Sequence, residues 1–292
     1  MTGAVGSSQD RGAKVPARPQ DVPTAGEFPV WQAVALGTLH GPAELLPISS
    51  SGHIAVIPWL ARWNYSRLDD ELRKSFEVAL HTGTALALLI SLRGEVEEAA
   101  RGLNLRRALL IGCSFVPPAV IGYRFERPIE RHFGTPPTVA AGLFAGAVAM
   151  ALADRSPQER TAEEAGVIDA LWLGVAQACS LIPGVSRNGA TLAAARMRRF
   201  GRVDANRLSR HAALPVIAGA TLLKGVRLSR RGLPAGAAVP FAAGAGAAFA
   251  STLASTRLIQ ALERDSSLLP YALYRIALAA AITRRLAREG GS

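Results

Sequence analysis

Long apolar runs separated by short polar stretches form the dominant pattern along this chain. A helix that crosses a bilayer needs about 20 mostly apolar residues. Runs near that length occur at 76–92, 107–123, 137–153, 167–182, 208–225, 235–256 and 268–284. The stretch from about 30 to 62 is also apolar, but Pro42, Pro47 and Pro58 interrupt it. The pattern predicts an all-α, polytopic membrane protein.

Composition agrees with this prediction. Of the 292 residues, 49% are hydrophobic and 6% aromatic, and the mean hydropathy is +0.21, which is too apolar for an ordinary soluble domain of this size. The net charge of +11 comes without a basic stripe and interleaved aromatics, so we expect no nucleic-acid partner. Most arginines lie in connecting segments, such as 196–202 and 227–231, where we expect them to meet the headgroups of membrane lipids.

The chain divides into a tail and one domain. Residues 1–28 are rich in Gly, Pro, Ser and Ala and have no apolar core of signal-peptide type, so we predict a disordered N-terminal tail. Residues 29–288 are predicted to form a single integral membrane domain. Cys113 and Cys179 lie far apart in apolar runs, with no metal or disulfide spacing, and are interpreted as packing residues.

The sequence repeats itself around two breaks in the apolar pattern. The stretch "ALGTLHGPAELLPISSSGH" at 35–53 resembles "WLGVAQACSLIPGVSRNGAT" at 172–191, and subtracting 137 from the second set of numbers places Ser186 on Ser49 without a gap. Interrupted hydrophobic segments at corresponding places in two halves point to a site between repeats. We therefore predict inverted repeats with two re-entrant helical hairpins, 35–62 and 172–200, whose tips meet around a polar cavity.

Both breaks carry side chains suited to phosphate chemistry. Arg187 is a permanent cation with a fork of donors that matches phosphate oxygens. Ser50 and His53 have the spacing of a nucleophile and its base, and Glu44 can hold a divalent cation such as Mg²⁺ or Ca²⁺. Together the breaks predict a pocket for a phosphorylated group on a lipid. Their polar residues are His40, Glu44, Ser49, Ser50, Ser51 and His53 in the first, and Ser186, Arg187, Asn188 and Thr191 in the second.

Each feature also has a simpler structural interpretation. A Ser-Ser-Ser-Gly run is usually a helix N-cap and turn, and His53 alone is more often a hydrogen-bonded interior residue. His40 shares a helical face with the acidic residue one turn later and can simply pair with it. His81 lies near Glu77, and a hydrogen bond between them is as consistent with the sequence as a place in the site. Arg187 resists such an interpretation, because it has no acidic neighbour in sequence.

The two breaks resemble the signature segments of the undecaprenyl-diphosphatase (bacitracin-resistance) family, "GLTEFLPISSSGH" and "PGVSRSGAT". The stretches "FEVALHTGTALALL" and "ALPVIAGATLL" resemble further helices of that family, and the likeness runs from about residue 30 to 285. The resemblance implies an integral membrane phosphatase domain, multi-pass in the cell membrane, with its active site facing the outer side. Its substrate would be a C55 isoprenyl diphosphate, hydrolysed to the monophosphate lipid carrier of peptidoglycan synthesis.

The resemblance also implies roles for individual residues. Ser50 would be the nucleophile or a phosphate contact, and His53 would transfer protons. Two positions depart from the family pattern: His40 stands where the family has Glu or Gln, and Asn188 replaces the usual Ser. The implied catalytic residues are Glu44, Ser50, His53 and Arg187; the substrate-binding residues are Ser49, Ser51, Ser186, Asn188 and Thr191; the metal ligands are Glu44 and His40, for Mg²⁺ or Ca²⁺.

Two classes of function remain open at this point. The first is the phosphatase, favoured by Ser50 and His53, because binding alone needs neither a nucleophile nor a base. The second is a non-hydrolytic transporter or flippase of isoprenyl phosphate lipids, since inverted repeats with broken helices are also transporter architecture. His40 is the feature that most favours the second class. A homodimer is left open.

Overall fold

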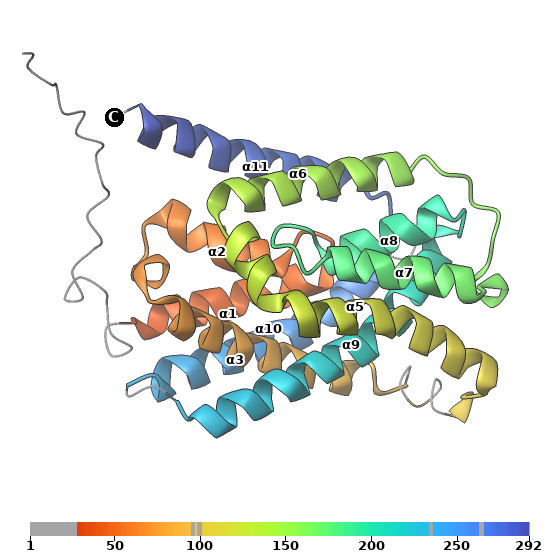
Figure 1. The fold of residues 1–292 in the computed structure, drawn as a ribbon, viewed down its shortest axis with the longest axis horizontal. Helices are drawn as coiled ribbons and strands as arrows, with labels where there is room; N and C mark the ends of the chain where they lie inside the picture. Colours follow the sequence, from red (N-terminus) through yellow and green to blue (C-terminus); the bar gives the residue numbers. More distant parts are fainter. Residues whose placement is uncertain (1–27, 95–96, 98–100, 234–235, 263–265, 292) are drawn as a thin grey trace, which may run out of the picture.

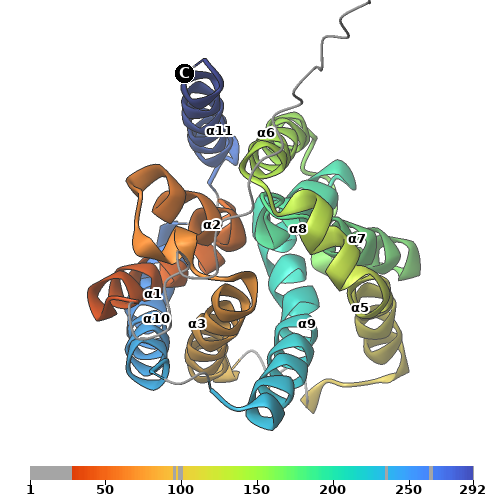
Figure 2. The same ribbon diagram turned by 60° about the vertical axis from the view of Figure 1, so that its left-hand side comes forward.

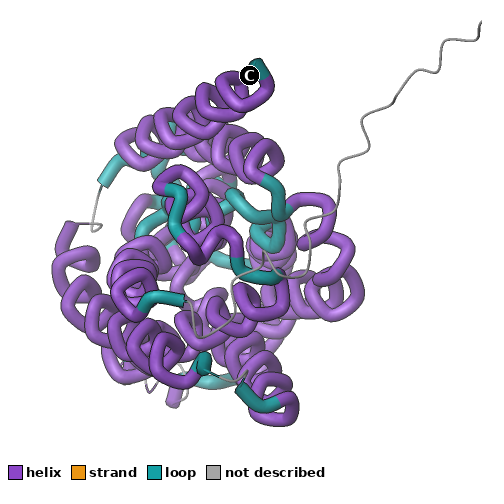
Figure 3. Tube along the Cα trace, turned by 90° about the vertical axis from the view of Figure 1, so that its left-hand side faces the viewer, coloured by secondary structure: helices purple, strands orange, loops and turns teal. Residues whose placement is uncertain are grey.

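The fold is built from α-helices throughout the part of the chain that the structure describes. This computed structural model describes residues 28–94, 97, 101–233, 236–262 and 266–291. Figure 3 shows helices joined by short loops, with no strand among these residues, and their only β-type pairing is the isolated bridge between Arg160 and Phe200. The predicted tail, residues 1–28, lies outside the described residues except for Phe28.

The helices fall into two consecutive groups, one before and one after the loop that follows residue 153. The first group comprises α1 (Val30–Leu45), α2 (Ser50–Ala61), the 3-10 turn η3 (Asn64–Arg67), α3 (Asp70–Ser91), α5 (Leu105–Phe133) and α6 (Pro136–Ala153). The second comprises the 3-10 turn η4 (Ala162–Glu164), α7 (Val167–Cys179), α8 (Arg187–Met197), α9 (Arg202–Arg231), α10 (Ala238–Leu262) and α11 (Leu269–Gly290).

Every predicted apolar run lies within or largely overlaps one helix. Among the described residues, Leu105–Ile129, Pro136–Ala153 and Ala238–Thr256 are long and apolar enough to cross a membrane. Helix α7 is apolar but has only 13 residues, and α3, α9 and α11 carry more polar side chains along their length. The chain is therefore an all-α membrane protein, in which only part of the predicted runs have the length and composition of simple spanning helices.

The element order of the first half recurs in the second with the offset found in the sequence. Val167, the first residue of α7, corresponds to Val30 of α1, and Arg187, the first residue of α8, corresponds to Ser50 of α2. Helices α3, α5 and α6 are matched in order by α9, α10 and α11. The hairpins α1–α2 and α7–α8 approach the centre of the molecule from opposite ends (Figure 1). These are the two inverted helical hairpins that the repeat predicts.

Each hairpin packs on a helix from the other half of the chain. Helix α1 lies along α10, and its counterpart α7 lies along α5 (Figure 2). Glycine permits both contacts. A methyl group on Gly37 of α1 would overlap the carbonyl oxygen of Gly244 in α10, and one on Gly174 of α7 would overlap Pro117 and the carbonyl oxygen of Cys113 in α5. The two halves are therefore interlocked through equivalent glycines.

Phe28 belongs to the packed domain, although its sequence position assigned it to the tail. Its ring lies 4.9 Å from that of Phe76, edge to face, and 5.6 Å from that of Tyr65. All three side chains are buried in one apolar cluster with residues of α1, α3 and α10. Aromatic packing of this kind stabilises the position of Phe28 just before α1.

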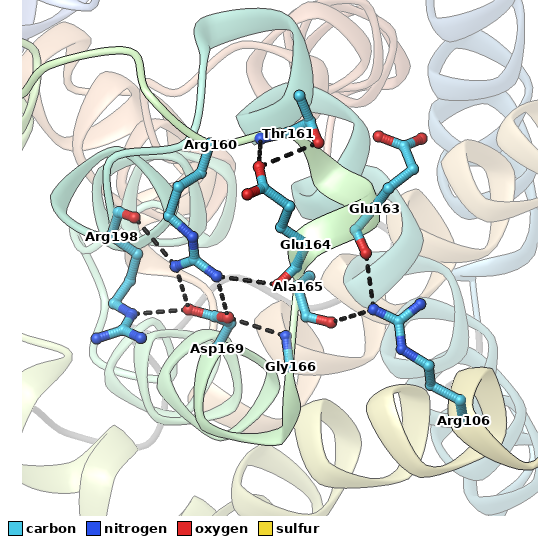
Figure 4. Close-up of polar contacts among 9 residues, drawn as sticks. All are labelled: Arg106, Arg160, Thr161, Glu163, Glu164, Ala165, Gly166, Asp169 and Arg198. Atoms are coloured by element: carbon cyan, nitrogen blue, oxygen red, sulfur yellow. Dashed lines mark hydrogen bonds and ion pairs between the residues drawn. The ribbon is translucent and has the colours of Figure 1, made fainter.

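Several arginines of the segment 196–202 bind groups within the protein, whereas the side chain of Arg199 is 57% exposed, so the expected contact with lipid headgroups stays a prediction. Arg196 is buried and donates to the backbone carbonyls of Ser156 and Phe200. Arg198 and Arg160 both donate to the carboxylate of Asp169, at 2.7 Å and 2.8 Å (Figure 4). These contacts fasten the loop between α6 and α7 to the start of the second hairpin. The sequence did not predict these ion pairs, because Asp169 lies far from Arg198 along the chain.

The glycine contacts predict opposite effects for two Gly→Ala substitutions. Gly37→Ala forces α1 and α10 apart, and overpacking of this kind typically costs about 1–3 kcal/mol. Gly246→Ala lies in α10 with no atom near its Cβ, so it should stabilise the helix by about 0.5–1 kcal/mol. Thermal unfolding of the two variants in detergent tests this. Equal melting temperatures for both variants would contradict the close contact between α1 and α10.

Candidate active site

The two helix breaks end at matching serine caps. Ser49 precedes α2, and its hydroxyl accepts from the N–H of Gly52 at 3.2 Å; Ser186 precedes α8 and accepts from the N–H of Gly189 at 3.1 Å. The simpler interpretation of the Ser-Ser-Ser-Gly run as an N-cap is therefore confirmed for Ser49, and Ser186 is an equivalent cap in the second break. Ser49 has a φ of 76°, a conformation that costs a non-glycine residue energy and recurs at functional sites.

One carboxylate from the first break accepts hydrogen bonds from two side chains, one in each break. Glu44, near the end of α1, accepts from the guanidinium of Arg187 at 2.8 Å and from the hydroxyl of Ser50 at 2.5 Å. The side chains of Glu44 and Arg187 are 11% and 18% exposed, so the pair is largely desolvated. The prediction that the two hairpin tips meet is confirmed by this contact between residues 143 positions apart.

Asn188, one of the two departures from the family pattern, adds a second link between the tips. Its amide nitrogen donates to the carbonyl oxygen of Leu45 at 2.6 Å, and its amide oxygen accepts from Ser209 at 3.0 Å. The first contact satisfies a carbonyl at the end of α1, where helical acceptors lack partners. The amide therefore joins both breaks to α9.

Arg275 of α11 holds the backbone of both breaks and was missed by the sequence interpretation. Its guanidinium is fully buried and donates to the carbonyl oxygens of Gly184 at 2.9 Å, Pro47 at 3.3 Å and Gly142 at 3.3 Å. The signal was present in the sequence, because an arginine inside the apolar run 268–284 is expensive in a membrane and marks a functional or structural contact.

A cavity of about 560 Å³ opens beside the meeting tips. Its polar end comes from the breaks, and its remaining walls are mostly apolar side chains of α5 and α9, such as Phe115 and Ile217. A polar end with apolar walls suits a phosphorylated headgroup attached to a hydrocarbon chain. The predicted site residues that line it are Glu44, Ser49, Ser50, Ser51, Ser186, Arg187 and Asn188; further polar lining residues are Glu77, His81, Thr84, Tyr123, Glu126, Gln177, Ser180 and Thr221.

The expected pair of Ser50 and His53 does not form in this structure. His53 is fully buried, with Nδ1 2.7 Å from the carbonyl oxygen of Ser49 and Nε2 2.7 Å from the hydroxyl of Tyr274. Ser50 instead donates to Glu44. Spacing along the sequence shows that two residues are close but not which way their side chains point. The hydroxyl that contacts His53 belongs to Tyr274 of α11. His53 therefore holds the backbone at Ser49 and does not line the cavity.

Thr191 likewise lies outside the cavity lining. Its hydroxyl contacts the carbonyl oxygens of Arg187 and Asn188 at 2.9 and 3.1 Å and the hydroxyl of Ser209 at 2.5 Å. These bonds keep the first turn of α8 in place, which positions Arg187. The geometry gives Thr191 a positioning role, in place of the direct substrate contact expected from the sequence.

The candidate cation site contains a third residue that the sequence left undecided. His40, Glu44 and His81 each offer one ligand atom, and these three atoms lie within 4.8 Å of one another. Two imidazoles and one carboxylate are a poor match for Mg²⁺ or Ca²⁺, which prefer oxygen ligands. The expected Mg²⁺ or Ca²⁺ therefore does not fit the donors that this chain presents.

The class of protein now follows from fold and site. Inverted broken hairpins place a desolvated arginine, a carboxylate and a serine at the polar end of a cavity with apolar walls, which describes an integral membrane protein with a site for a phosphorylated lipid. The family model described as "Bacitracin resistance protein BacA" matches residues 33–281. The chain belongs to this family.

The chain aligns with several relatives named undecaprenyl-diphosphatase over almost the whole length of those relatives. The protein of Geobacter sulfurreducens is 36% identical over 266 residues, covering 87% of this chain and 97% of the relative. Those of Thermomicrobium roseum and Moorella thermoacetica are 37% and 36% identical, with 85% and 87% of this chain and 95% and 96% of the relative covered. The predicted family is thus confirmed.

Removing the Arg275 guanidinium should destabilise the breaks. Arg275→Leu leaves buried carbonyl oxygens at Pro47 and Gly184 without donors, at a typical cost of about 1–3 kcal/mol for each unsatisfied group. Arg284→Leu is the matched control, since Arg284 is exposed in the same helix. Thermal unfolding should show a large decrease only for Arg275→Leu. Similar melting temperatures for the two variants would contradict the role assigned to Arg275.

Proposed function

We propose that this chain is an undecaprenyl-diphosphatase, which hydrolyses the terminal phosphate of a C55 isoprenyl diphosphate to yield the monophosphate carrier of peptidoglycan synthesis. The observation that carries the proposal is the Glu44 carboxylate, shared by Ser50 and Arg187 at the polar end of the cavity. Ser50 as the nucleophile, Glu44 as the base and Arg187 as the phosphate-binding cation are thus joined by direct hydrogen bonds. Family membership and the names of the relatives support the same function.

The cavity supports a particular placement of the substrate. Its volume of about 560 Å³ suits the diphosphate and the first isoprene units, so most of the chain would lie against α5 and α9 in the lipid. The phosphoryl oxygens would face Arg187 and the first N–H groups of α2 and α8, which lack helical acceptors and carry the positive end of the helix dipole. Arg187 and these N–H groups would therefore lie where negative charge increases on the phosphoryl oxygens during hydrolysis.

Ser50 and Glu44 provide a route for the reaction. Ser50 Oγ loses its proton to Glu44 as it attacks the terminal phosphorus, the bond to the bridging oxygen breaks, and the lipid monophosphate leaves. Water then attacks the phosphoserine, the Ser50 hydroxyl is regenerated, inorganic phosphate leaves, and one proton passes to solvent. Arg187 stabilises the charge on the phosphoryl oxygens in both steps. Direct attack by water held by Glu44 is the alternative route.

We also propose that the protein resides in the cell membrane with its cavity open to the outer side. The three apolar spanning helices and the family support a membrane location. The cavity lies between broken helices, where polar groups at membrane depth are tolerated because protein and water surround them. A lipid headgroup could therefore enter from one membrane surface.

A non-hydrolytic flippase is the second candidate function. The inverted hairpins favour it, because transporters place their substrate sites between repeats of this kind. The hydrogen bond from Ser50 to Glu44 favours the enzyme, since a carrier needs no activated hydroxyl. The two candidates differ in whether phosphate is released.

Purified protein should release inorganic phosphate from undecaprenyl diphosphate, and Ser50→Ala should reduce the rate by about 100-fold or more, as expected when a nucleophile or proton route is lost. Ser66→Ala is the control, because Ser66 lies in η3, does not line the cavity, and donates its hydroxyl to the carbonyl oxygen of Trp63. Trapping of a phosphoserine would distinguish Ser50 attack from water attack. Lipid transfer between leaflets without phosphate release would instead support the flippase.

Arg187→Lys should lower kcat/KM for the same substrate by about 100-fold, which is typical for losing one donor to a developing oxyanion. Lysine keeps the charge opposite Glu44, so the melting temperature should stay near that of the wild type. Lysine lacks the planar fork that binds two phosphate oxygens together. A fully active lysine variant would reduce Arg187 to a general positive charge.

A further inference from the structure

Three side chains have the composition of a transition-metal site: Glu44 and His81 line the cavity, and His40 is buried and does not line it. His40 and Glu44 lie one turn apart on α1, where residues four apart share a helical face, and His81 faces them from α3. One ligand atom from each residue lies within 4.8 Å of the other two. The rings of His40 and His81 meet edge to face, with centroids 4.6 Å apart.

The surroundings of His40 orient it as a ligand. Its Nδ1 lies 2.9 Å from the hydroxyl oxygen of Thr84, and both residues are buried. Histidines that bind metals almost always use the second ring nitrogen in such a bond, which fixes the ring and leaves the other nitrogen for the metal. Thr84 follows His81 by three residues on α3, so one helix supplies both a ligand and the orienting group.

Glu44 can serve the site while keeping its other contacts. An ionised carboxylate has about four lone-pair directions on its two oxygens. Arg187 and Ser50 use one oxygen each, at 2.8 and 2.5 Å, so directions remain on both. The cation would then lie next to the groups that bind and attack the phosphorylated substrate.

The donor set selects the class of metal. Imidazole nitrogens suit Zn²⁺, Fe²⁺, Co²⁺ and similar ions, whereas Mg²⁺ and Ca²⁺ prefer carboxylate, carbonyl and water oxygens. Two histidines and one carboxylate, with positions left for other ligands, are typical of catalytic sites for the first group. The resemblance leads one to expect Glu or Gln at position 40, so this donor set is a feature of this chain.

We propose that His40, His81 and Glu44 form a binding site for a divalent transition metal of the Zn²⁺ and Co²⁺ class, selective against Mg²⁺ and Ca²⁺. An ion held by these three residues would act as a Lewis acid toward oxygens of the phosphorylated substrate and would stabilise their negative charge. The role in hydrolysis rests on the proposed function, but the binding of metal does not.

Binding can be measured on the intact purified protein in detergent, after treatment with a chelator, with Co²⁺ as the spectroscopic probe. We expect one equivalent of Co²⁺ to bind and give visible d–d absorption. Zn²⁺ should displace it, and a large excess of Mg²⁺ or Ca²⁺ should not. This measurement needs no variant. Displacement of Co²⁺ by Mg²⁺, or the absence of stoichiometric binding, would overturn the proposal.

Variants locate the site. His40→Gln and His81→Gln should each weaken Co²⁺ binding by at least roughly 100-fold, and Thr84→Val, which removes the orienting bond, should weaken it by about 10–100-fold. His132→Gln is the matched control, because that histidine is exposed near the end of α5 and contacts the carbonyl oxygen of Pro128. Unchanged affinity in both His40→Gln and His81→Gln would overturn the assignment.

The selectivity itself can be reversed. His40→Glu combined with His81→Gln replaces both imidazoles by oxygen donors, so Co²⁺ affinity should fall and Mg²⁺ or Ca²⁺ should begin to stimulate phosphate release. If Co²⁺ binds as expected but undecaprenyl diphosphate is not hydrolysed, the metal site stands and the proposed function fails. If hydrolysis proceeds at full rate with no metal bound, the function stands and the catalytic role of the metal is overturned.

Discussion

The backbone carbonyls and charged side chains at the two helix breaks must find hydrogen-bond or ionic partners inside the protein. The rest of the structure depends on this constraint. Within a membrane, an unpaired carbonyl or charge has no water to bind. Arg275 supplies donors to the carbonyls of both breaks, and Glu44 and Arg187 neutralise each other across them. Because the partners come from different parts of the chain, the breaks are stable only when both halves have assembled.

The contacts of Glu44 also keep polar side chains in place within a packed helical protein. Arg187 is held by one oxygen of the Glu44 carboxylate, and Ser50 is held by the other. A buried pair of this kind contributes little net stability, since desolvation offsets much of the attraction. Its value lies in geometry, because both groups are positioned before any substrate arrives.

Sequence patterns predicted the local parts of this arrangement well. Proline, glycine and serine at the interruptions located both breaks, and the repeat offset placed the first residues of α2 and α8 at equivalent positions. Arg187 and Glu44 stood out because each is an ionisable residue in apolar surroundings. Directions and long-range partners were not predictable in this way. These details depend on how α1, α2, α3 and α11 pack: they decide that Ser50 pairs with Glu44, that His53 pairs with Tyr274, and where His81 lies.

The exchanged packing of α1 on α10 and of α7 on α5 has an evolutionary consequence. A polypeptide half as long, inserted into the bilayer in both orientations, would satisfy the same contacts as a symmetric homodimer. Perfect symmetry, however, would give both tips the same side chains. Here the position equivalent to Glu44 is Leu181, and the position equivalent to Arg187 is Ser50. The two halves therefore differ at the site that they share: the first supplies the carboxylate and the second the guanidinium, so a repeated fold holds one asymmetric charge pair.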